Sequence, residues 1–218
     1  MKTAQQILDH QIPVLNEDFD LTDALRCMDE MRVNELPIVV SGKYKGMVSE
    51  NQILDIEHQE HFIMPALFEK SILPDDHFFA MIHFFAQNQV SVAPVVSKSN
   101  EYLGCVTRED LVEVIQEYTT AQQDGGVVIL EMSPRDYTLQ QIARIVEEND
   151  AKIVSLFAYP NERGLTEVMF KVDIKNVNPI IRSLERFEYR VRGSFQHADS
   201  NVDLMDRYDT LMRFLDED

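Results

Sequence analysis

The sequence predicts an α+β protein: a duplicated β-α-β-β-α unit, then a ferredoxin-like β-α-β-β-α-β domain and a terminal helix. Residues 36–40 (LPIVV) and 46–49 (GMVS) return as 93–96 (APVV) and 104–107 (GCVT). The apolar pattern changes beyond the polar, glycine-bearing stretch 122–126, and the 44% apolar content suffices for real cores. Two copies of one unit suggest halves that pack on each other and leave a cleft between them.

Composition narrows the class of protein. The chain has 218 residues, and 20 Lys and Arg against 38 Asp and Glu give a net charge of −18. Such a charge repels phosphate backbones and anionic membranes, so we expect neither as a partner. No apolar run is long enough for a signal peptide or a membrane span, which predicts a cytoplasmic protein. Cys27 and Cys105 match no metal-ligand spacing, and both are predicted to be buried thiols.

In the first repeat, apolar residues at helical spacing follow Asp20, and a proline-led apolar run then precedes a polar turn. Ser49 is well placed to cap the helix that follows. The expected elements are a helix from 21 to about 33 capped by Asp20 or Thr22, strands 36–40 and 44–48, and a helix from 52 to about 58.

The second repeat keeps this order. The offset between matching residues is 56 from Ala24 to Ala80, 57 from Pro37 to Pro94 and 58 from Gly46 to Gly104. Single-residue insertions thus fall where loops are expected, as in a genuine duplication. The expected elements are a helix after Asp76 through 79–84, strands 92–96 and 102–106, and a helix capped by Thr107 through Leu111, Val114 and Ile115.

Beyond residue 126 the order of elements is that of the split βαβ arrangement, a four-stranded sheet with two helices on one face. The expected strands are 127–132, 152–159, 166–172 and 189–195, and the expected helices are 139–148 and 178–187. Residues 202–215 carry Met205, Tyr208, Met212 and Leu215 on one helical face. This surface helix is expected to dock on its own protomer or a second copy, the alternative being another protein. The predicted domains are 1–122 (repeats about 1–60 and 61–122), 126–196 and 200–218.

Residues 104–110 follow the pattern glycine, two apolar residues, threonine, two variable residues, aspartate. In its helix and hairpin setting this pattern resembles the CBS domain, and the duplication over about residues 1–120 resembles the tandem CBS pair. Residues 126–196 resemble an ACT-like domain, whose first turn, 132–137, has no glycine here and so favours a pairing module over an amino-acid site. The whole resembles the acetoin-utilisation B-type regulatory proteins of bacteria.

The CBS resemblance implies a nucleotide site in the cleft, with adenine between apolar strand segments and the ribose and phosphate at a hydroxyl and a carboxylate. Side-chain chemistry agrees, because Thr107 at a helix start can donate to a phosphate and Asp110 can accept from ribose hydroxyls. Alternatively, Thr107 is only a helix cap and Asp110 only a favourable charge. In the first repeat Gln52 replaces the aspartate, which predicts a weaker half-site beside Ser49.

The candidate nucleotide-binding residues are Thr107, Asp110, Arg108, Pro94, Val95, Leu73, Ser49 and Ile12. Core packing explains the apolar members equally well. Arg108 could reach a phosphate, but an exposed, solvated side chain is favoured. His58 and His61 are three apart, but with no third ligand a solvated helix face is favoured over a metal site. The apolar run 78–85 is expected to be a helix buried between repeats, with His83 in the core or at its rim.

No catalytic motif is present and no carboxylate pair stands out, so we expect neither an enzyme nor a catalytic cofactor. The leading hypothesis is a regulatory protein that senses AMP, ADP, ATP or S-adenosylmethionine and passes the bound state to a protein partner through the ACT-like domain, as a homodimer. The alternative is an interaction or dimerisation scaffold with a degenerate nucleotide cleft. Sensing requires that the ligand bind two arrangements of the repeats with different affinities.

Overall fold

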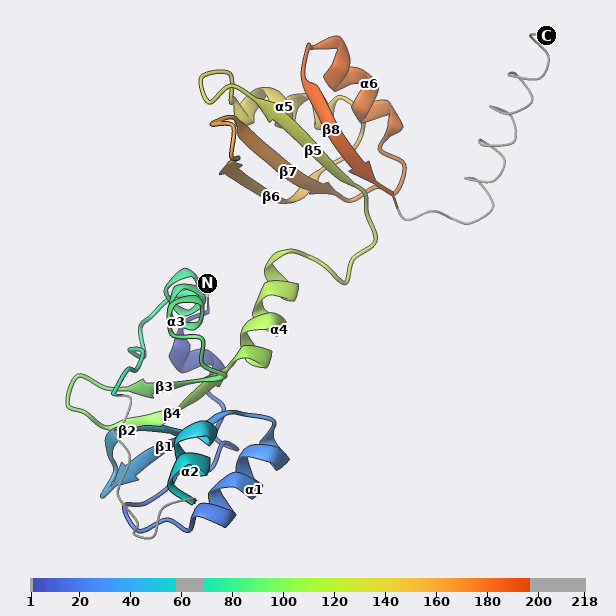
Figure 1. The fold of residues 1–218 in the computed structure, drawn as a ribbon. Helices are drawn as coiled ribbons and strands as arrows, with labels where there is room; N and C mark the ends of the chain where they lie inside the picture. The colour runs from blue at the N-terminus through green and yellow to red at the C-terminus, as the bar shows by residue number, and fades with distance from the viewer. Residues whose placement is uncertain (1, 58–68, 197–218) are drawn as a thin grey trace. The chain divides into compact units, whose positions relative to one another are not determined.

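The computed structural model describes residues 2–57 and 69–196. The chain divides into two compact units, Met1–Ile115 and Gln116–Asp218 (Figure 1). Both combine helices with antiparallel sheets, so the predicted α+β class is confirmed. The predicted terminal helix in 200–218 and the histidines at positions 58 and 61 lie outside the described residues.

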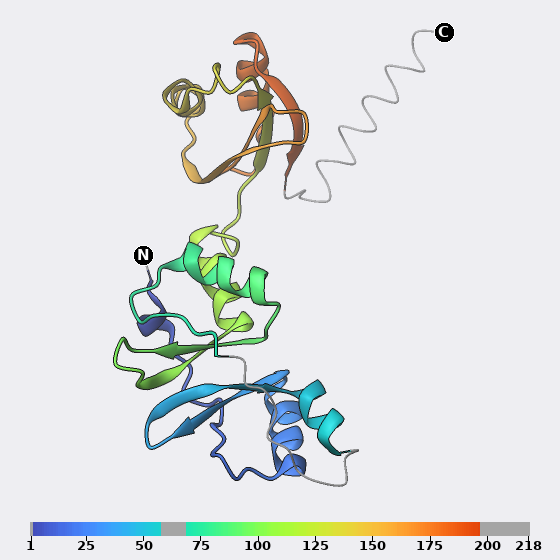
Figure 2. The ribbon, with the colours of Figure 1, turned by 60° about the vertical axis from the view of Figure 1, so that its left-hand side comes forward.

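Two β-hairpins with their flanking helices make up the first part of the chain, in the predicted helix-strand-strand-helix order. The leading strand of each predicted β-α-β-β-α unit is reduced to a single bridge, Leu15 to Ile38 in one and Ile72 to Val95 in the other. Figure 2 shows α1 and α2, in blue and cyan, beside one hairpin, and α3 and α4, in green, beside the other. The elements are η1 (Ala4–Ile7), α1 (Leu21–Met31), β1 (Glu35–Val40), β2 (Lys43–Ser49), α2 (Glu50–Glu57), α3 (Phe78–Asn88), β3 (Val92–Val96), β4 (Tyr102–Thr107) and α4 (Arg108–Tyr118).

The duplication extends to the backbone angles. Helices α1 and α3 both end at a left-handed residue, Arg32 (φ 55°) and Gln89 (φ 56°). Helix α1 therefore stops before residue 33, where the apolar pattern had placed its end. Both hairpin ladders shift register next to a glycine, Gly46 (φ 141°) in one and Gly104 (φ 145°) in the other. Side chains rarely adopt such φ values, so the repeated glycine has a backbone reason.

The core of the first unit draws on both repeats, which confirms that the halves pack together. Its buried cluster consists of Ile12, Ala24, Met28, Val33, Leu36, Ile38, Val48, Ile53, Val92 and Cys105. Burial raises the pKa of the Cys105 thiol to about 12. Cys27 is only half-buried, so the prediction of two buried thiols holds for Cys105 alone.

Two tyrosines occupy matching positions in the hairpins. The hydroxyl of Tyr44 donates to the carbonyl of Lys70 (2.9 Å), and that of Tyr102 lies 3.1 Å from Cys105 Sγ. Burial is the main reason why the pKa of each phenol is raised above its usual value. Both rings are therefore part of the packed interior at neutral pH.

Helix α3 buries one face, not its whole surface. Phe78, Met81 and Phe85 are buried, whereas Phe79 is 64% exposed. His83 is exposed, which excludes the core, the first of the two places predicted for it. The helix begins after His77, whose Nδ1 accepts the N–H of Ala80 at 3.3 Å, instead of at Asp76.

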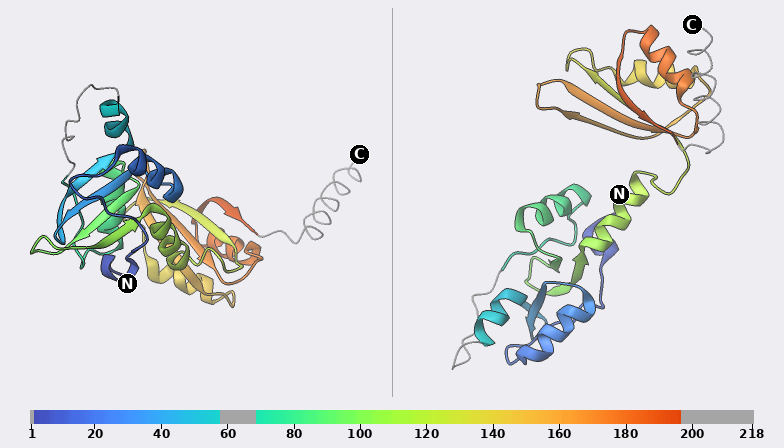
Figure 3. Two further views of the ribbon diagram at one scale, coloured as in Figure 1. Left: turned by 90° about the horizontal axis from the view of Figure 1, so that it is seen from below. Right: turned by 45° about the vertical axis from the view of Figure 1, so that its right-hand side comes forward.

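The second unit has one four-stranded sheet in the order β6-β7-β5-β8, with every neighbouring pair antiparallel. This is the strand order of the split βαβ arrangement. The right-hand view of Figure 3 shows both helices along one side of the sheet. The elements are β5 (Val127–Met132), α5 (Leu139–Glu147), β6 (Ile153–Pro160), β7 (Thr166–Val172), α6 (Asn178–Arg186) and β8 (Arg190–Phe195).

Along β5 and β7, successive side chains point to opposite faces of this sheet. Val128, Leu130 and Phe170 point into the core beneath the helices. The opposite face carries a buried carboxylate, Glu131, held by ion pairs to Arg190 (3.0 Å) and Arg192 (2.9 Å). The Arg192 hydrogen bond, aided by Arg190, holds the pKa of Glu131 below its usual value.

Gly125 and Gly126 are buried at the entrance to β5, although their composition is that of a flexible linker. A Cβ on Gly125 would collide with the carbonyl of Val172, and one on Gly126 with Val177. The N–H of Gly126 donates to the carbonyl of Ile174 (2.8 Å). The glycine pair therefore allows close backbone packing. In the sequence it also lies where the apolar pattern of the repeats ends.

Candidate functional site

Thr107 and Asp110 lie side by side where β4 passes into α4. Asp110 Oδ2 accepts the backbone N–H of Thr107 (2.7 Å) and its hydroxyl (2.6 Å). The hydroxyl in turn accepts the N–H of Asp110 (3.1 Å). This reciprocal arrangement is a capping box, which satisfies amides at a helix start that otherwise lack partners. Thr107 is the helix cap that its sequence position predicted.

The capping box determines what the pair offers a ligand. The hydroxyl proton of Thr107 is engaged by Asp110 Oδ2 and one lone pair by the N–H of Asp110, so the hydroxyl offers its second lone pair and no donor. Asp110 Oδ1 has no hydrogen-bond partner among the residues that the structure describes, and Asp110 is half-buried. The pair therefore presents charged and neutral acceptors, which suit hydroxyl groups better than phosphate oxygens.

Ser49 and Gln52 form the same box in the first repeat. Gln52 Oε1 accepts the N–H of Ser49 (2.9 Å) and its hydroxyl (3.1 Å), and Ser49 Oγ accepts the N–H of Gln52 (3.3 Å). Glutamine is a usual residue at this position of a capping box. The first repeat therefore has the same local structure as the second, but it lacks the negative charge that Asp110 provides there.

Arg108 is exposed but held. Its Nε donates to the carbonyl of Val90 (2.7 Å), and its backbone N–H donates to the carbonyl of Ser91 (3.2 Å). A guanidinium has five N–H donors, so the Nη groups remain for an anion. The side chain is therefore positioned by its own repeat and is not a freely moving surface group.

The apolar candidates separate into buried and exposed residues. Pro94 and Val95 are buried in β3, where they pair with Cys105 and Gly104 of β4. Ile12 is 5% exposed and belongs to the core cluster. Leu73 differs, since its side chain is 41% exposed and its N–H donates to Asp76 Oδ2 (2.8 Å). Leu73 is thus the one member of this set with a large accessible apolar surface.

A polar contact between the repeats went unnoticed in the sequence. Glu35 Oε2 accepts both the hydroxyl (2.6 Å) and the N–H (2.8 Å) of Ser91, whose Oγ accepts the N–H of Asn34 (2.8 Å). Glu35 pairs with Ser49 in its own ladder, and the carbonyl of Ser91 accepts from Arg108. The contact thus adjoins both helix starts. The 57-residue spacing of Asn34 and Ser91, equal to that of the two prolines, was the available signal.

Within residues 2–57 and 69–196, no cluster of three or more His, Cys, Asp or Glu side chains is arranged to hold a metal ion. Over the same ranges, no helix has the length and apolar character needed to cross a membrane.

A comparison with protein families completes the description of these repeats. The model of the CBS domain matches residues 4–58 and again residues 69–117. These residues form a tandem pair of CBS domains. The two matched segments coincide with the two hairpin units described above, so the CBS pair predicted from the sequence is confirmed.

Three solved structures are among those similar to this chain. A CBS domain pair/ACT domain protein from Thermotoga maritima is 18% identical, with 53% of this chain and 98% of that chain covered and a TM-score of 0.46. A putative acetoin utilization protein from Vibrio cholerae is 21% identical, with 56% and 96% covered and a TM-score of 0.47. A CBS domain pair in complex with 5′-methylthioadenosine and S-adenosyl-L-methionine is 20% identical, with 52% and 99% covered and a TM-score of 0.45.

Proposed function

We propose that the CBS pair binds an adenosine-containing ligand at the Thr107–Asp110 half-site. The observation that carries the proposal is the second oxygen of Asp110, an acceptor without a partner among the described residues, beside a helix start in the CBS motif. Ribose hydroxyls are donors, and a hydrogen bond to a carboxylate is roughly twice as strong as one between neutral groups. Asp110 Oδ1 is therefore the ribose acceptor.

The remaining candidate residues take complementary parts. Arg108, held by Val90, directs its Nη groups to a phosphate when the ligand has one. Leu73 contacts the adenine with its exposed side chain, while Pro94, Val95 and Ile12 form the packed support below. Ser49 and Gln52 provide the second, uncharged half-site.

The bound state reaches a protein partner through the second unit, which we propose is an ACT-like pairing module in a cytoplasmic homodimer. Its strand order supports this assignment, as does the absence of glycine from the turn 132–137. The role is regulatory and not catalytic. For a ligand to act in this way, its affinity must differ between two arrangements of the repeats.

The test compares adenosine with 2′,3′-dideoxyadenosine by isothermal titration, on the unmodified chain and on Asp110→Asn. The unmodified chain should prefer adenosine by about tenfold, because the charge-assisted bond to a ribose hydroxyl is lost in the analogue. Asp110→Asn should remove most of this preference, since the two changes delete one interaction. Asp75→Asn, at an exposed position, is the matched control and should keep the preference.

A thermal-shift panel of AMP, ADP, ATP and S-adenosylmethionine accompanies the titration. A ligand at about 100 times its dissociation constant stabilises the folded chain by roughly 2.7 kcal/mol, which is readily measured. The absence of any shift at millimolar concentration would leave the scaffold as the better function. The uncharged Ser49–Gln52 half-site is the observation that favours this second candidate.

A further inference from the structure

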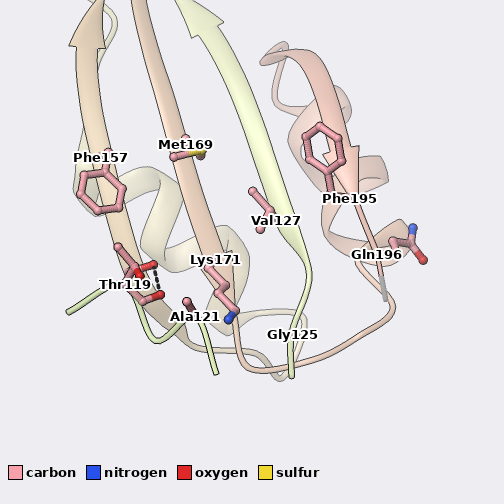
Figure 4. Close-up of a pocket in the computed structure, with 10 residues that line it drawn as sticks. Thr119, Ala121, Gly125, Val127, Phe157, Met169, Lys171, Phe195 and Gln196 are labelled. Atoms are coloured by element: carbon pink, nitrogen blue, oxygen red, sulfur yellow. Dashed lines mark hydrogen bonds between the residues drawn. The ribbon is translucent and has the colours of Figure 1, made fainter. Parts of the chain in front are cut away.

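The second unit contains a cavity of about 480 Å³ on the face of its sheet opposite the helices. Figure 4 shows Phe157 and Met169 on neighbouring strands, Val127 on the next strand and Phe195 on the edge strand. No residue of the turn 132–137 lines the cavity, so it is separate from the turn to which the ACT resemblance points. Its volume lies in the range of small-molecule pockets.

The apolar side chains of this cavity are unusually accessible. Phe157 is 40% exposed and Phe195 is 64% exposed, although both are large and apolar. Exposed aromatic surface that gathers in a concave place is typical of a binding site and not of ordinary protein surface. Covering these rings with an apolar group would remove that surface from water and favour binding.

One wall of the cavity carries a lysine, Lys171, that has no counter-ion among residues 2–57 and 69–196. Lys171 Nζ donates to the backbone carbonyls of Thr120 (2.5 Å) and Gln123 (2.6 Å). An ammonium has three donors, so one N–H remains. Among the described residues, no carboxylate lies within 4.0 Å of Lys171 Nζ, whereas nearby Lys175 pairs with Asp124 at 3.0 Å.

The backbone on this side is fixed by a second contact. Ser155 Oγ donates to the carbonyl of Thr119 (3.3 Å), the bond drawn dashed in Figure 4. Ser155 and Lys171 thus hold residues 119–123 as a wall of the cavity, with the ammonium beside the apolar rings. The cavity combines one fixed positive charge with an aromatic and aliphatic floor.

We propose that this cavity binds a small organic monocarboxylate with an aryl or branched alkyl body. The carboxylate accepts the remaining N–H of Lys171 and supplies the missing negative charge. The body of the ligand covers Phe157, Met169 and Phe195. A phosphate dianion fits less well, because desolvating two negative charges needs more donors than one partly engaged ammonium provides.

The experiment uses the full chain with ¹³C-labelled methionine methyl groups and three probes: 4-phenylbutyrate, its neutral amide 4-phenylbutanamide, and phenyl phosphate. We expect 4-phenylbutyrate to shift the Met169 methyl signal in a saturable manner. It should bind about tenfold more tightly than the amide, which keeps the apolar body and lacks the charge. Phenyl phosphate should also bind more weakly than 4-phenylbutyrate.

Three variants locate the interaction. Lys171→Met should lower the affinity for 4-phenylbutyrate to that of the amide, and Lys152→Met, at an exposed position that does not line the cavity, should leave it unchanged. Because Lys171 also holds the wall, Phe157→Ser provides an independent test. This partly exposed ring is outside the buried cores, so the variant should fold and lose affinity for the acid and the amide alike.

Several results would overturn the proposal. Equal affinity for the acid and the amide would show that Lys171 does not recognise the carboxylate. A Met169 signal that depends on protein concentration, and not on the probe, would assign the surface to contact between two copies of the chain. A shift of the same signal on deletion of residues 198–218, without any probe, would assign it to that segment.

Discussion

The hydroxyl of Ser91 donates a 2.6 Å hydrogen bond to Glu35 Oε2, and this bond crosses from the second CBS repeat to the first. The same oxygen also accepts the N–H of Ser91, so one carboxylate satisfies two groups of a buried residue. The repeats are therefore joined by a specific polar contact as well as by a shared apolar core.

Replacement of Glu35 tests the contribution of this contact to stability. Glu35→Ala leaves the Ser91 amide and hydroxyl without their partner, which should cost about 1–3 kcal/mol in the free energy of unfolding measured with urea. Glu101→Ala is the matched control, because Glu101 pairs with Lys43 across the repeats at 3.5 Å but is 58% exposed. An exposed pair contributes about 0–1 kcal/mol, so equal losses in the two variants would contradict this prediction.

Replacement of Gln52 separates local structure from charge in the first half-site. Gln52→Asp should keep the helix cap, supply the missing carboxylate and raise the number of adenosine molecules bound per chain in isothermal titration. Gln52→Glu is the control, since glutamate preserves the capping box but has a longer side chain than Asp110. An unchanged stoichiometry in Gln52→Asp would mean that charge is not what the first half-site lacks.

The buried Glu131 predicts how acid affects the second unit. The hydrogen bond from Arg192 and the charge of Arg190 hold its pKa below the usual value, so the folded state favours the carboxylate. This stabilisation is complete above the ordinary glutamate pKa of about 4.3 and is lost as the pH falls through the folded-state pKa. In urea unfolding across this pH range, the free energy of unfolding of Glu131→Gln should fall less on acidification than that of the unmodified chain. Exposed Glu162→Gln should match the unmodified chain.

Two glycines of the second unit should differ in their sensitivity to the same substitution. Gly125→Ala places a methyl group against the carbonyl of Val172, a backbone atom that cannot move aside cheaply. The loss in stability should be about 1–3 kcal/mol or more. Gly193→Ala meets no atom within 4 Å and should change stability by less than about 0.5 kcal/mol. Thermal unfolding of the two variants provides the comparison.

The two cysteines should differ in reactivity toward a disulfide reagent at pH 8. Burial raises the pKa of Cys105 to about 12, so almost none of it is the reactive thiolate while the unit is folded. Half-buried Cys27 should therefore react first, and Cys105 only after unfolding. The variants Cys27→Ser and Cys105→Ser assign the two phases, and rapid labelling of folded Cys27→Ser would refute the expectation.

The strands were predicted to within about one residue because alternation and the repeated glycine are local signals, as in β5 and β7. The capping role of Thr107 was also readable, since a hydroxyl and a carboxylate three apart suffice for it. The sequence did not reveal that Gln52 caps its helix as Asp110 does. Gln52 and Asp110 differ in charge, but both can accept the hydrogen bonds of a capping box. The Glu35–Ser91 contact and the cavity beside Lys171 join residues far apart in sequence, and no local pattern encodes such contacts.

The environment of Tyr44 and Tyr102 provides the first unit with an optical reporter of its own. The chain has no tryptophan and seven tyrosines, so phenol absorption dominates its near-ultraviolet spectrum. Exposed phenols ionise above about pH 10, whereas burial raises the pKa of these two and delays their ionisation while the unit is folded. Their delayed ionisation marks the opening of the first unit, and alkaline solution favours that opening because the unfolded chain releases both protons more readily.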